Sequence, residues 1–538
     1  MDDFVNLDAN NGWSRSLTTF VRGAAFLNDT LIQKDSFIKE LEDIKDVSEF
    51  ITLLKKLNGF FAIVLQKNGI VMAAVDKVRS MPLFYGLKEG NLYLSDDAGW
   101  VRTQVKNGQN NQVAEAEFLL TGYVTGEDTL CLGVKQLQAG EILTTHVEGG
   151  RKVVQKIRYY RYLHNFHNGE ARINKESLSI VLDRVVINCT QRLIQFANGR
   201  EIVIPLSGGY DSRLIAMTLK RLGYNNVIAF TYGKRGNKES EISKWVAKCL
   251  DMKWYFVPYN NYTWWKWFHS EERNAYYRRA HNLVSVPHIQ DWPAVKVLKE
   301  QNIIDENAIF VPGHSGDFLA GSHIPTMVFN NTQLNLALFI KAIIERHYSL
   351  WPFNELDAVV QEQLKSRIMQ TGEGRDLSIP SHMADAFEEW DWQERQAKFI
   401  INSVRVYEFW GYNWWLPLWD AEMMDFWAGV PLEFRQGQKF YSEYVSKIFG
   451  RITGIGVSVA KRSANEQSFA NIKGIIKKSV LSPPLISAYI NIKKRLEYYN
   501  HPLSWYGIMS KKTFNQSKCK FNHVNSFLVK DLLGRNPL

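Results

Sequence analysis

The strongest constraint on the fold is a short segment, residues 202–224, in which a strand runs through a glycine-rich loop directly into a helix. Its β-branched start, I-V-I-P-L, predicts a buried strand. The loop reads S-G-G-Y-D-S, and apolar residues at helical spacing follow it. Paired glycines let the backbone approach a ligand closely, and a helix N-terminus offers unpaired N–H groups to an anion. The segment therefore predicts a pyrophosphate cradle, distinct from the Walker A and G-x-G-x-x-G loops.

Further apolar runs continue this pattern after the loop, over residues 227–232, 254–257 and 309–311. Helical segments separate them, as is typical of buried parallel strands in a doubly wound α/β sheet. An amphipathic helix is predicted before the first strand, over residues 178–196, and beyond residue 333 the chain reads as almost wholly helical.

The first 150 residues follow another pattern, that of an α+β domain with two sheets. A helical region is predicted over residues 35–57, and short strands over residues 60–65, 70–75, 92–95 and 141–146. The polar, basic stretch beyond Gly149 and Gly150 predicts a linker over residues 151–175.

The net charge of +10 is concentrated at the C-terminal end of the 538-residue chain. Residues 471–538 contain 12 Lys and Arg against two acids, so this segment accounts for the whole excess. The charge therefore describes a basic C-terminal tail and gives no reason to expect a nucleic-acid partner. The tail predicts peripheral contact with an anionic inner-membrane surface.

The four cysteines lie far apart and form no C-x-x-C pair, which argues against a disulfide framework or a zinc site. The sequence has no apolar run long enough to span a bilayer and no secretory signal at its start. We therefore expect a cytoplasmic protein, associated with the cytoplasmic face of the membrane if the basic tail binds there.

Several segments together resemble the asparagine synthetase superfamily, whose PP-loop ATP pyrophosphatase domain cleaves ATP between the α- and β-phosphates. The S-G-G-Y-D-S loop resembles the PP-loop. Residues 311–321 resemble the family's S-G-E-G-x-D-E-L-F-G-G loop, and residues 416–431 resemble its E-x-R-x-P-F-L-D segment. In the N-terminal part, residues 57–62, 76–85 and 122–140 resemble motifs of the glutaminase domain.

The resemblance implies two domains, one α+β and one α/β. Residues 1–150 would form an αββα amidotransferase-like domain of the Ntn type. Residues 176–470 would form a Rossmann-like adenine nucleotide alpha hydrolase domain with helical elaboration, the PP-loop ATP-binding domain. The basic tail, residues 471–538, lies outside the resemblance.

The resemblance also implies the ligands and the residues that bind them. ATP and Mg²⁺ would be the cofactors. Asp211 and Asp317 would hold the metal, and Lys461 would join these two acids as a catalytic residue that stabilises the leaving pyrophosphate. The nucleotide would contact Leu206, Ser207, Gly208, Gly209, Asp211, Ser212, Thr231, Tyr232 and Gly313.

Departures from the family pattern fall in both domains. Asp2 stands where glutaminase members have a cysteine after the initiator methionine, so we expect a degenerate domain that does not hydrolyse glutamine. In the synthetase half, four residues differ from the family pattern, and we interpret them as changes on the acceptor side of the site. They argue against free aspartate as the substrate. They are Arg213, His314, Phe318 and Trp415.

The acceptor is therefore predicted to be another carboxylate. The helix expected over residues 393–410 places Arg395, Asn402 and Arg405 on a candidate acceptor face. The favoured function is an AMP- and pyrophosphate-forming amide ligase that acts on a uronic acid of a surface polysaccharide, with ammonia or another amine as second substrate.

Other functions stay open at this point. One is an ammonia-dependent asparagine synthetase, and another is an intramolecular amide synthetase of the β-lactam synthetase or lasso-peptide cyclase type. The third alternative is not an enzyme but a non-catalytic nucleotide-binding protein. A homodimer also stays open, because nothing in the sequence fixes the oligomeric state.

Overall fold

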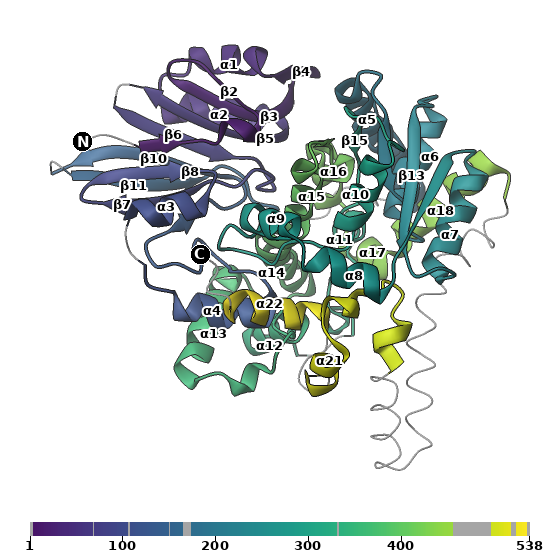
Figure 1. Ribbon diagram of the computed structural model, residues 1–538. Coiled ribbons are helices and arrows are strands. Elements are labelled where there is room, and N and C mark those ends of the chain that lie inside the picture. Colours follow the sequence, from purple (N-terminus) through teal and green to yellow (C-terminus); the bar gives the residue numbers. More distant parts are fainter. Residues whose placement is uncertain are drawn as a thin grey trace.

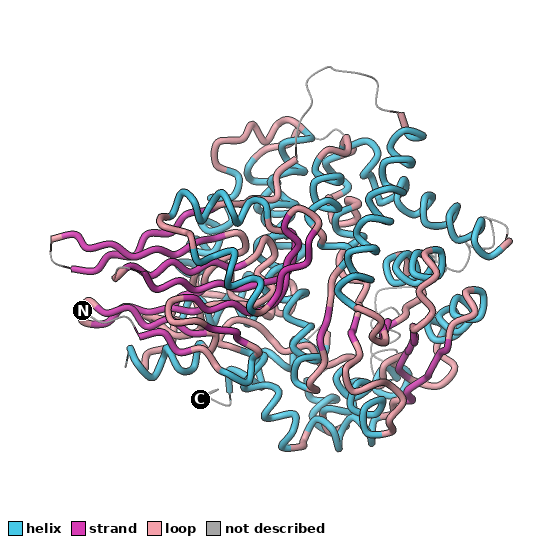
Figure 2. The backbone as a smooth tube through the Cα atoms, turned by 90° about the horizontal axis from the view of Figure 1, so that it is seen from above, coloured by secondary structure: helices cyan, strands magenta, loops and turns pink. Residues whose placement is uncertain are grey.

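The computed structural model describes residues 4–67, 69–105, 108–149, 151–164, 174–330, 333–455, 496–517 and 523–534. Figure 1 shows a β-rich N-terminal part beside a larger part in which a sheet and many helices mix. From above, in Figure 2, the N-terminal strands project to one side of the helices. The described residues thus form a mixed α/β structure with three sheets.

The larger N-terminal sheet is antiparallel, with strand order β11-β10-β6-β5-β3-β2 and with β4 paired to β3. Strand β5 buries Ala62 and Val64 in one cluster of apolar side chains and Phe61 and Ile63 in another, so both faces of the sheet are covered. The strands of this sheet are β2 (Trp13–Arg15), β3 (Thr19–Leu27), β4 (Thr30–Gln33), β5 (Asn58–Lys67), β6 (Ile70–Val75), β10 (Glu141–Glu148) and β11 (Arg151–Arg158).

The second N-terminal sheet has the order β1-β8-β7-β9. Helices α1 and α2 cover the outer face of the larger sheet, and α3 contacts β7 and β8 of the smaller one. Each of the two N-terminal sheets is thus covered by helices on one side. The elements are β1 (Phe4–Asn6), η1 (Ala9–Asn11), α1 (Asp35–Glu42), α2 (Val47–Lys56), β7 (Phe84–Lys88), β8 (Asn91–Ser95), α3 (Ala98–Val105), α4 (Gln112–Thr121) and β9 (Lys135–Gln136).

The predicted linker over residues 151–175 is wrong in its first half. Strand β11 pairs with β10 along the full length of both strands, from Glu148↔Arg151 to Glu141↔Arg158. Gly149, with φ +56°, begins the reversal between them. Basic residues are accommodated in this edge strand because they have acidic partners: Lys156 pairs with Glu127, and Arg158 pairs with Glu141.

The larger part is built on a parallel sheet of order β14-β13-β12-β15-β16. The four strands predicted from the apolar runs are confirmed, and β16 is an additional edge strand that joins Asn413 to Ile309. The elements are α5 (Lys175–Ala197), β12 (Ile202–Pro205), α6 (Asp211–Arg221), β13 (Val227–Gly233), α7 (Lys238–Cys249), β14 (Lys253–Pro258), α8 (Asn261–Phe268), α9 (Glu271–His281), α10 (Trp292–Glu300), β15 (Ile309–Phe310), α11 (Gly316–Leu319) and β16 (Asn413–Trp414).

A helical lobe follows and is nearly continuous, as predicted. Its unusual element is a π-helix, η4 (Trp392–Ile400), which directly continues α14. The remaining elements are η2 (Thr326–Val328), α12 (Leu336–His347), η3 (Phe353–Glu355), α13 (Ala358–Gly372), α14 (Pro380–Asp391), η5 (Ile401–Val404), α15 (Arg405–Phe409), η6 (Pro417–Trp419), α16 (Ala421–Ala428), α17 (Leu432–Arg435), η7 (Gln436–Gln438) and α18 (Lys439–Thr453).

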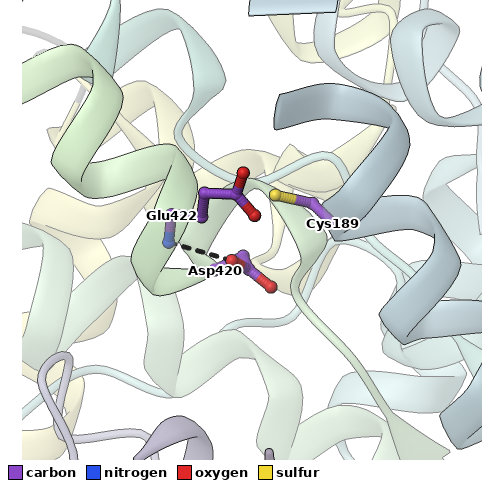
Figure 3. Close-up of side chains that lie close together, drawn as sticks. All are labelled: Cys189, Asp420 and Glu422. Carbon is purple, nitrogen blue, oxygen red and sulfur yellow. Dashed lines mark hydrogen bonds between the residues drawn. The ribbon is translucent and has the colours of Figure 1, made fainter. Parts of the chain in front are cut away.

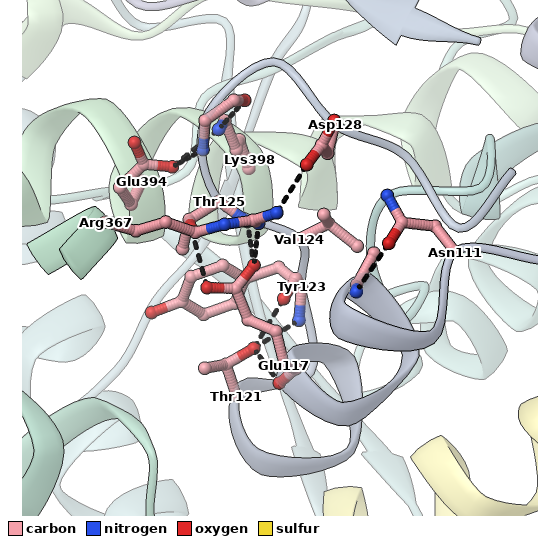
Figure 4. A network of polar contacts seen from close by, with 12 residues as sticks. Asn111, Glu117, Thr121, Tyr123, Val124, Thr125, Asp128, Arg367, Glu394 and Lys398 are labelled. Atoms are coloured by element: carbon pink, nitrogen blue, oxygen red, sulfur yellow. Dashed lines mark hydrogen bonds and ion pairs between the residues drawn. The ribbon is translucent and has the colours of Figure 1, made fainter. Parts of the chain in front are cut away.

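The helical lobe and the N-terminal domain share polar contacts that are buried or half-buried. The Trp392 indole donates to the carbonyl of Lys77 at 3.0 Å, and the Lys398 amine donates to the carbonyl of Gly126 at 2.6 Å. Figure 4 shows how the buried carboxylate of Glu117 receives Arg367 of α13, at 3.1 Å. The two parts therefore satisfy each other's polar groups.

The prediction of a basic tail from residue 471 is wrong for the described residues beyond 495. Trp505 and Leu528 are buried, and the Trp264 indole of α8 donates to the carbonyl of Leu503 at 2.6 Å. Residues 471–495 lie outside the described residues, so their predicted contact with a membrane stays a prediction. The elements of this C-terminal segment are η8 (Trp505–Ile508), α21 (Lys511–Ser517) and α22 (Val524–Gly534), of which α22 packs on α4.

Among the described residues, no helix combines the length and the apolar character needed to cross a bilayer.

Docking of the C-terminal segment predicts a stability effect. Leu528→Ala removes a fully buried side chain, so we expect it to lower the free energy of unfolding by about 2–5 kcal/mol. Leu496→Ala is the matched control, because Leu496 begins the same segment and is 51 % exposed. Urea unfolding of both variants tests this, and equal midpoints for the two would contradict the docking.

Candidate functional site

The candidate site lies where the strand order of the parallel sheet reverses. Strand β12 has β13 on one side and β15 on the other, and the chain leaves β12 and β15 at the same edge of the sheet. Ligands of open α/β sheets bind in the crevice outside the carboxyl ends of the strands at such a reversal. The loop that ends in Asp211 follows β12, and the loop that contains Asp317 follows β15.

The first loop is held in shape by its own serines. The backbone N–H of Ser207 donates to the Ser212 hydroxyl at 3.1 Å, and the N–H of Gly209 donates to the Ser207 hydroxyl at 3.2 Å. A Cβ on Gly208 would lie 3.3 Å from Ile242 of α7. The loop is therefore compact, and it leads into the N-terminus of α6, where unpaired N–H groups favour an anion.

Glycines in the second loop allow the two loops to meet. A Cβ on Gly313 would lie only 2.5 Å from the nitrogen of Ser212, and one on Gly316 would lie 2.9 Å from Cγ of Asp211. Neither separation is compatible with a side chain. The residue types at these two positions are thus fixed by the contact between the loops.

The two predicted metal ligands come together. The backbone N–H of Asp317 donates to Oδ2 of Asp211 at 3.1 Å, and the Ser322 hydroxyl donates to Oδ2 of Asp317 at 3.1 Å. Asp211 also accepts from the Tyr441 hydroxyl of α18 at 2.8 Å. Burial and the charge of Asp317 raise the pKa of Asp211. A cation between the carboxylates would offset that repulsion, so this oxygen donor set fits Mg²⁺.

A chain of polar contacts continues from Asp317 into the helical lobe. His323 lies with Nε2 3.8 Å from Asp317 and with Nδ1 2.7 Å from the buried carboxylate of Asp391. The Gln396 amide donates to Asp391 at 2.9 Å and accepts from the Ser315 hydroxyl at 2.6 Å. This chain ties the end of α14 and the π-helix to the loop that carries Asp317.

The predicted nucleotide-contacting residues beyond the loops lie on β13 and at its end. The Thr231 hydroxyl donates to the carbonyl of Leu206 at 2.6 Å, so it supports the start of the first loop from behind. The Tyr232 ring stacks on Tyr259, with centroids 5.2 Å apart. Lys461 lies outside the described residues, and its predicted catalytic role stays a prediction.

The substituted family positions do not form an acceptor surface, which corrects the interpretation of the sequence. Arg213, Phe318 and Trp415 are buried, and the Arg213 guanidinium donates to the carbonyl of Gly208 at 3.1 Å, behind the loop. Trp415 stacks on Phe196 with centroids 4.5 Å apart. His314 is half-buried, and its Nε2 lies 3.3 Å from the Ser403 hydroxyl. These side chains shape the interior of the domain.

The predicted acceptor face over residues 393–410 is likewise only partly correct, because Asn402 and Arg405 already have structural partners. The Asn402 amide donates to the carbonyl of Ala280 at 2.9 Å, and Arg405 pairs with Glu408 at 2.7 Å. Arg395 is half-buried beside Asp391, with which it interacts electrostatically. Only this arginine remains as a candidate acceptor contact from that helix.

A second cluster of ligand-type side chains lies away from the candidate site. Cys189, Asp420 and Glu422 lie close enough to surround an ion (Figure 3). The Arg192 guanidinium already pairs with Asp420 at 2.7 Å and with Glu422 at 2.5 Å. The acids are therefore neutralised by an arginine, and the cluster is an ion-pair network.

Sequence patterns could not have identified several of the residues around the acids. Tyr441, Ser322, His323, Asp391 and Gln396 belong to no motif, and they reach the site from α18, from the turn after α11 and from the α14–η4 junction. Local composition predicts only the glycine-rich loops of the site.

Comparisons with known proteins agree with this geometry in part. The asparagine synthase family model matches residues 194–263, which contain α5's end, the first loop and the start of α8. A search of curated protein sequences finds no significant match.

Solved structures give only distant likenesses. An NH₃-dependent NAD synthetase from Campylobacter jejuni is 14 % identical over 37 % of this chain and 95 % of its own, with a TM-score of 0.21. A glutamine phosphoribosylpyrophosphate amidotransferase from B. subtilis is 10 % identical over 56 % of this chain and 62 % of its own, with a TM-score of 0.18. TM-scores this low support no conclusion about the overall structure.

The family match falls on the segment that forms the first loop, and the structure brings the second acid of the pattern to that loop. The segment that forms the first loop therefore resembles the asparagine synthase family, and the rest of the chain lies outside that match.

Proposed function

We propose that this protein is an AMP- and pyrophosphate-forming amide ligase that adenylates a carboxylate other than free aspartate. The observation that carries the proposal is the convergence of Asp211 and Asp317 on the glycine-rich loop at the reversal point of the sheet. A non-catalytic nucleotide-binding protein would not need two acids held together, because their charge repulsion is unfavourable.

In the proposed reaction, an oxygen of the substrate carboxylate attacks the α-phosphorus of ATP, and the bond to the β-phosphate oxygen breaks. The amine then attacks the acyl carbon of the mixed anhydride and loses a proton, and AMP leaves. The N–H groups of the first loop and of the α6 N-terminus hold phosphate oxygens, and Asp211 and Asp317 would hold Mg²⁺, which supplies positive charge for the departing pyrophosphate. Lys461 is proposed to add to that charge.

The acceptor that we favour is a uronic acid of a surface polysaccharide, with ammonia as the amine. This choice follows from the sequence resemblance. ATP–pyrophosphate exchange tests it, with uronic acids and their nucleotide sugars, free aspartate and linear peptides as separate substrates.

Each outcome of that experiment selects one function. Exchange that depends on a uronic acid supports the proposal. Exchange with aspartate and formation of asparagine from ammonium would instead establish an asparagine synthetase, and exchange with a peptide would favour an intramolecular amide synthetase. ATP binding without exchange for any carboxylate would leave a non-catalytic nucleotide-binding protein.

Removal of either acid should stop the chemistry. Asp211→Asn and Asp317→Asn each remove a charged metal ligand, which is worth several kcal/mol of transition-state stabilisation, so we expect exchange to fall by about 10²-fold or more. Asp251→Asn is the control, because Asp251 is an aspartate whose side chain is 96 % exposed. Exchange at the wild-type rate in Asp317→Asn would contradict the assignment.

Tyr441 should tune the metal site without being essential. Its hydroxyl orients Asp211, so Tyr441→Phe is expected to raise the Mg²⁺ concentration for half-maximal exchange about tenfold while saturating Mg²⁺ restores most of the rate. Tyr444→Phe serves as control, because the Tyr444 hydroxyl of the same helix contacts Asp183 at 2.9 Å. Identical Mg²⁺ dependence in both variants would rule out this role.

A further inference from the structure

Two arginines of the helical lobe that lie near Asp391 have no counter-ion in contact within the described part of the chain. Arg367, Arg375 and Arg435, by contrast, each pair with a carboxylate. Among the described residues, Arg346 and Arg395 form neither an ion pair nor a hydrogen bond, although both lie near acids. Their guanidinium groups are therefore free to bind an external anion.

Both arginines interact electrostatically with one buried carboxylate, that of Asp391. Arg346 is in the last turn of α12, next to His347, whose Nε2 is 3.7 Å from Oδ2 of Asp391. Arg395 follows Asp391 by four residues in the π-helix and interacts electrostatically with Asp391 and His347. Asp391 itself is already occupied, because His323 and Gln396 are its hydrogen-bond partners.

The π-helix accounts for this placement. Its wider turn lets Gln396, five residues after Asp391, reach back to the Asp391 carboxylate at 2.9 Å. Gln396 rather than Arg395 thus takes the oxygen of Asp391. The arginine one position earlier is left without a contact to that acid. Helical segments of this kind occur frequently at functional sites.

One arginine of the pair lies within electrostatic range of a predicted metal acid. Arg346 interacts electrostatically with Asp317 as well as with Asp391, and His323 lies between these two acids. Beside Arg395, the hydroxyl of Tyr123 is buried and has no hydrogen-bond partner among the described residues. A hydroxyl without a partner thus lies near Arg395, and Arg346 lies within electrostatic range of Asp317.

The chemistry of adenylation requires cations at such a position. A carboxylate and the phosphates of ATP repel each other, so the attacking anion must be held by groups that neutralise it and fix its orientation. Guanidinium groups suit this task because their planar N–H pairs match the two oxygens of a carboxylate. We propose that Arg346 and Arg395 bind the carboxylate of the acceptor substrate beside ATP; this inference rests on the proposed function.

Half-saturation constants in ATP–pyrophosphate exchange test the assignment. The variants are Arg346→Ala, Arg395→Ala and Arg395→Lys, assayed with the carboxylate that supports exchange in the wild type. Each alanine variant should raise the half-saturating carboxylate concentration about 10- to 100-fold and leave that for ATP within about twofold. Arg395→Lys should recover part of the loss, because it restores the charge without the planar geometry.

Arg451→Ala is the matched control, since Arg451 is an exposed arginine of α18 that also lacks an ion pair in the described structure. It should change neither constant. Because Arg346 and Arg395 have no structural partner to lose, their thermal unfolding midpoints should stay close to that of the control.

The outcomes separate this inference from the function on which it rests. Exchange in the wild type with unchanged carboxylate constants in both alanine variants would overturn the arginine assignment alone. A rise in the ATP or pyrophosphate constant with an unchanged carboxylate constant would also overturn it, and would place the arginines at the phosphates. Absence of exchange with every carboxylate in the wild type would overturn the proposed function, and with it the acceptor assignment.

Discussion

The hydrogen bond from the backbone of Asp317 to the carboxylate of Asp211 is the contact around which the catalytic half is organised. It requires β12 and β15 to be neighbours, and it requires two loops to approach more closely than any side chain would allow at Gly313 or Gly316. Burying one acid beside another is unfavourable, so the surrounding hydroxyl donors, Tyr441 and Ser322, compensate part of the lost hydration. The repulsion between the two carboxylates is not compensated by these donors, and a cation bound between Asp211 and Asp317 would offset it.

The parts of the fold that could be predicted from the sequence are those encoded locally. Apolar β-branched runs give the parallel strands, and two glycines between a strand and a helix give the first loop, because both signals lie within a few consecutive residues. Strand β16 has only two residues, and its partner β15 is distant from it in the sequence, so no local pattern predicts it. The same applies to the contact between His323 and Asp391, which joins two elements with no shared motif.

Two errors of the sequence interpretation have a common physical origin. Residues 151–158 include four Lys or Arg, and residues 496–534 belong to the predicted basic tail although only five of them are basic; in both cases basic composition is taken as a sign of exposure. Lysine and arginine carry long apolar stems and tolerate an edge strand or the solvent face of a docked helix, so their presence says little about whether the backbone is packed. The buried Trp505 and Leu528 within the second segment were the better indicators.

The shared polar contacts between the N-terminal domain and the helical lobe bear on how this chain can evolve. The carbonyls of Lys77 and Gly126 are the partners of the Trp392 indole and the Lys398 amine. Deletion of the first 160 residues would remove both acceptors and expose to water the surface of the larger part that packs on them, including Trp414 and Trp415, which contact Phe60. Because uncovered apolar surface favours aggregation, the N-terminal domain keeps the rest of the chain in solution whatever its own chemistry is.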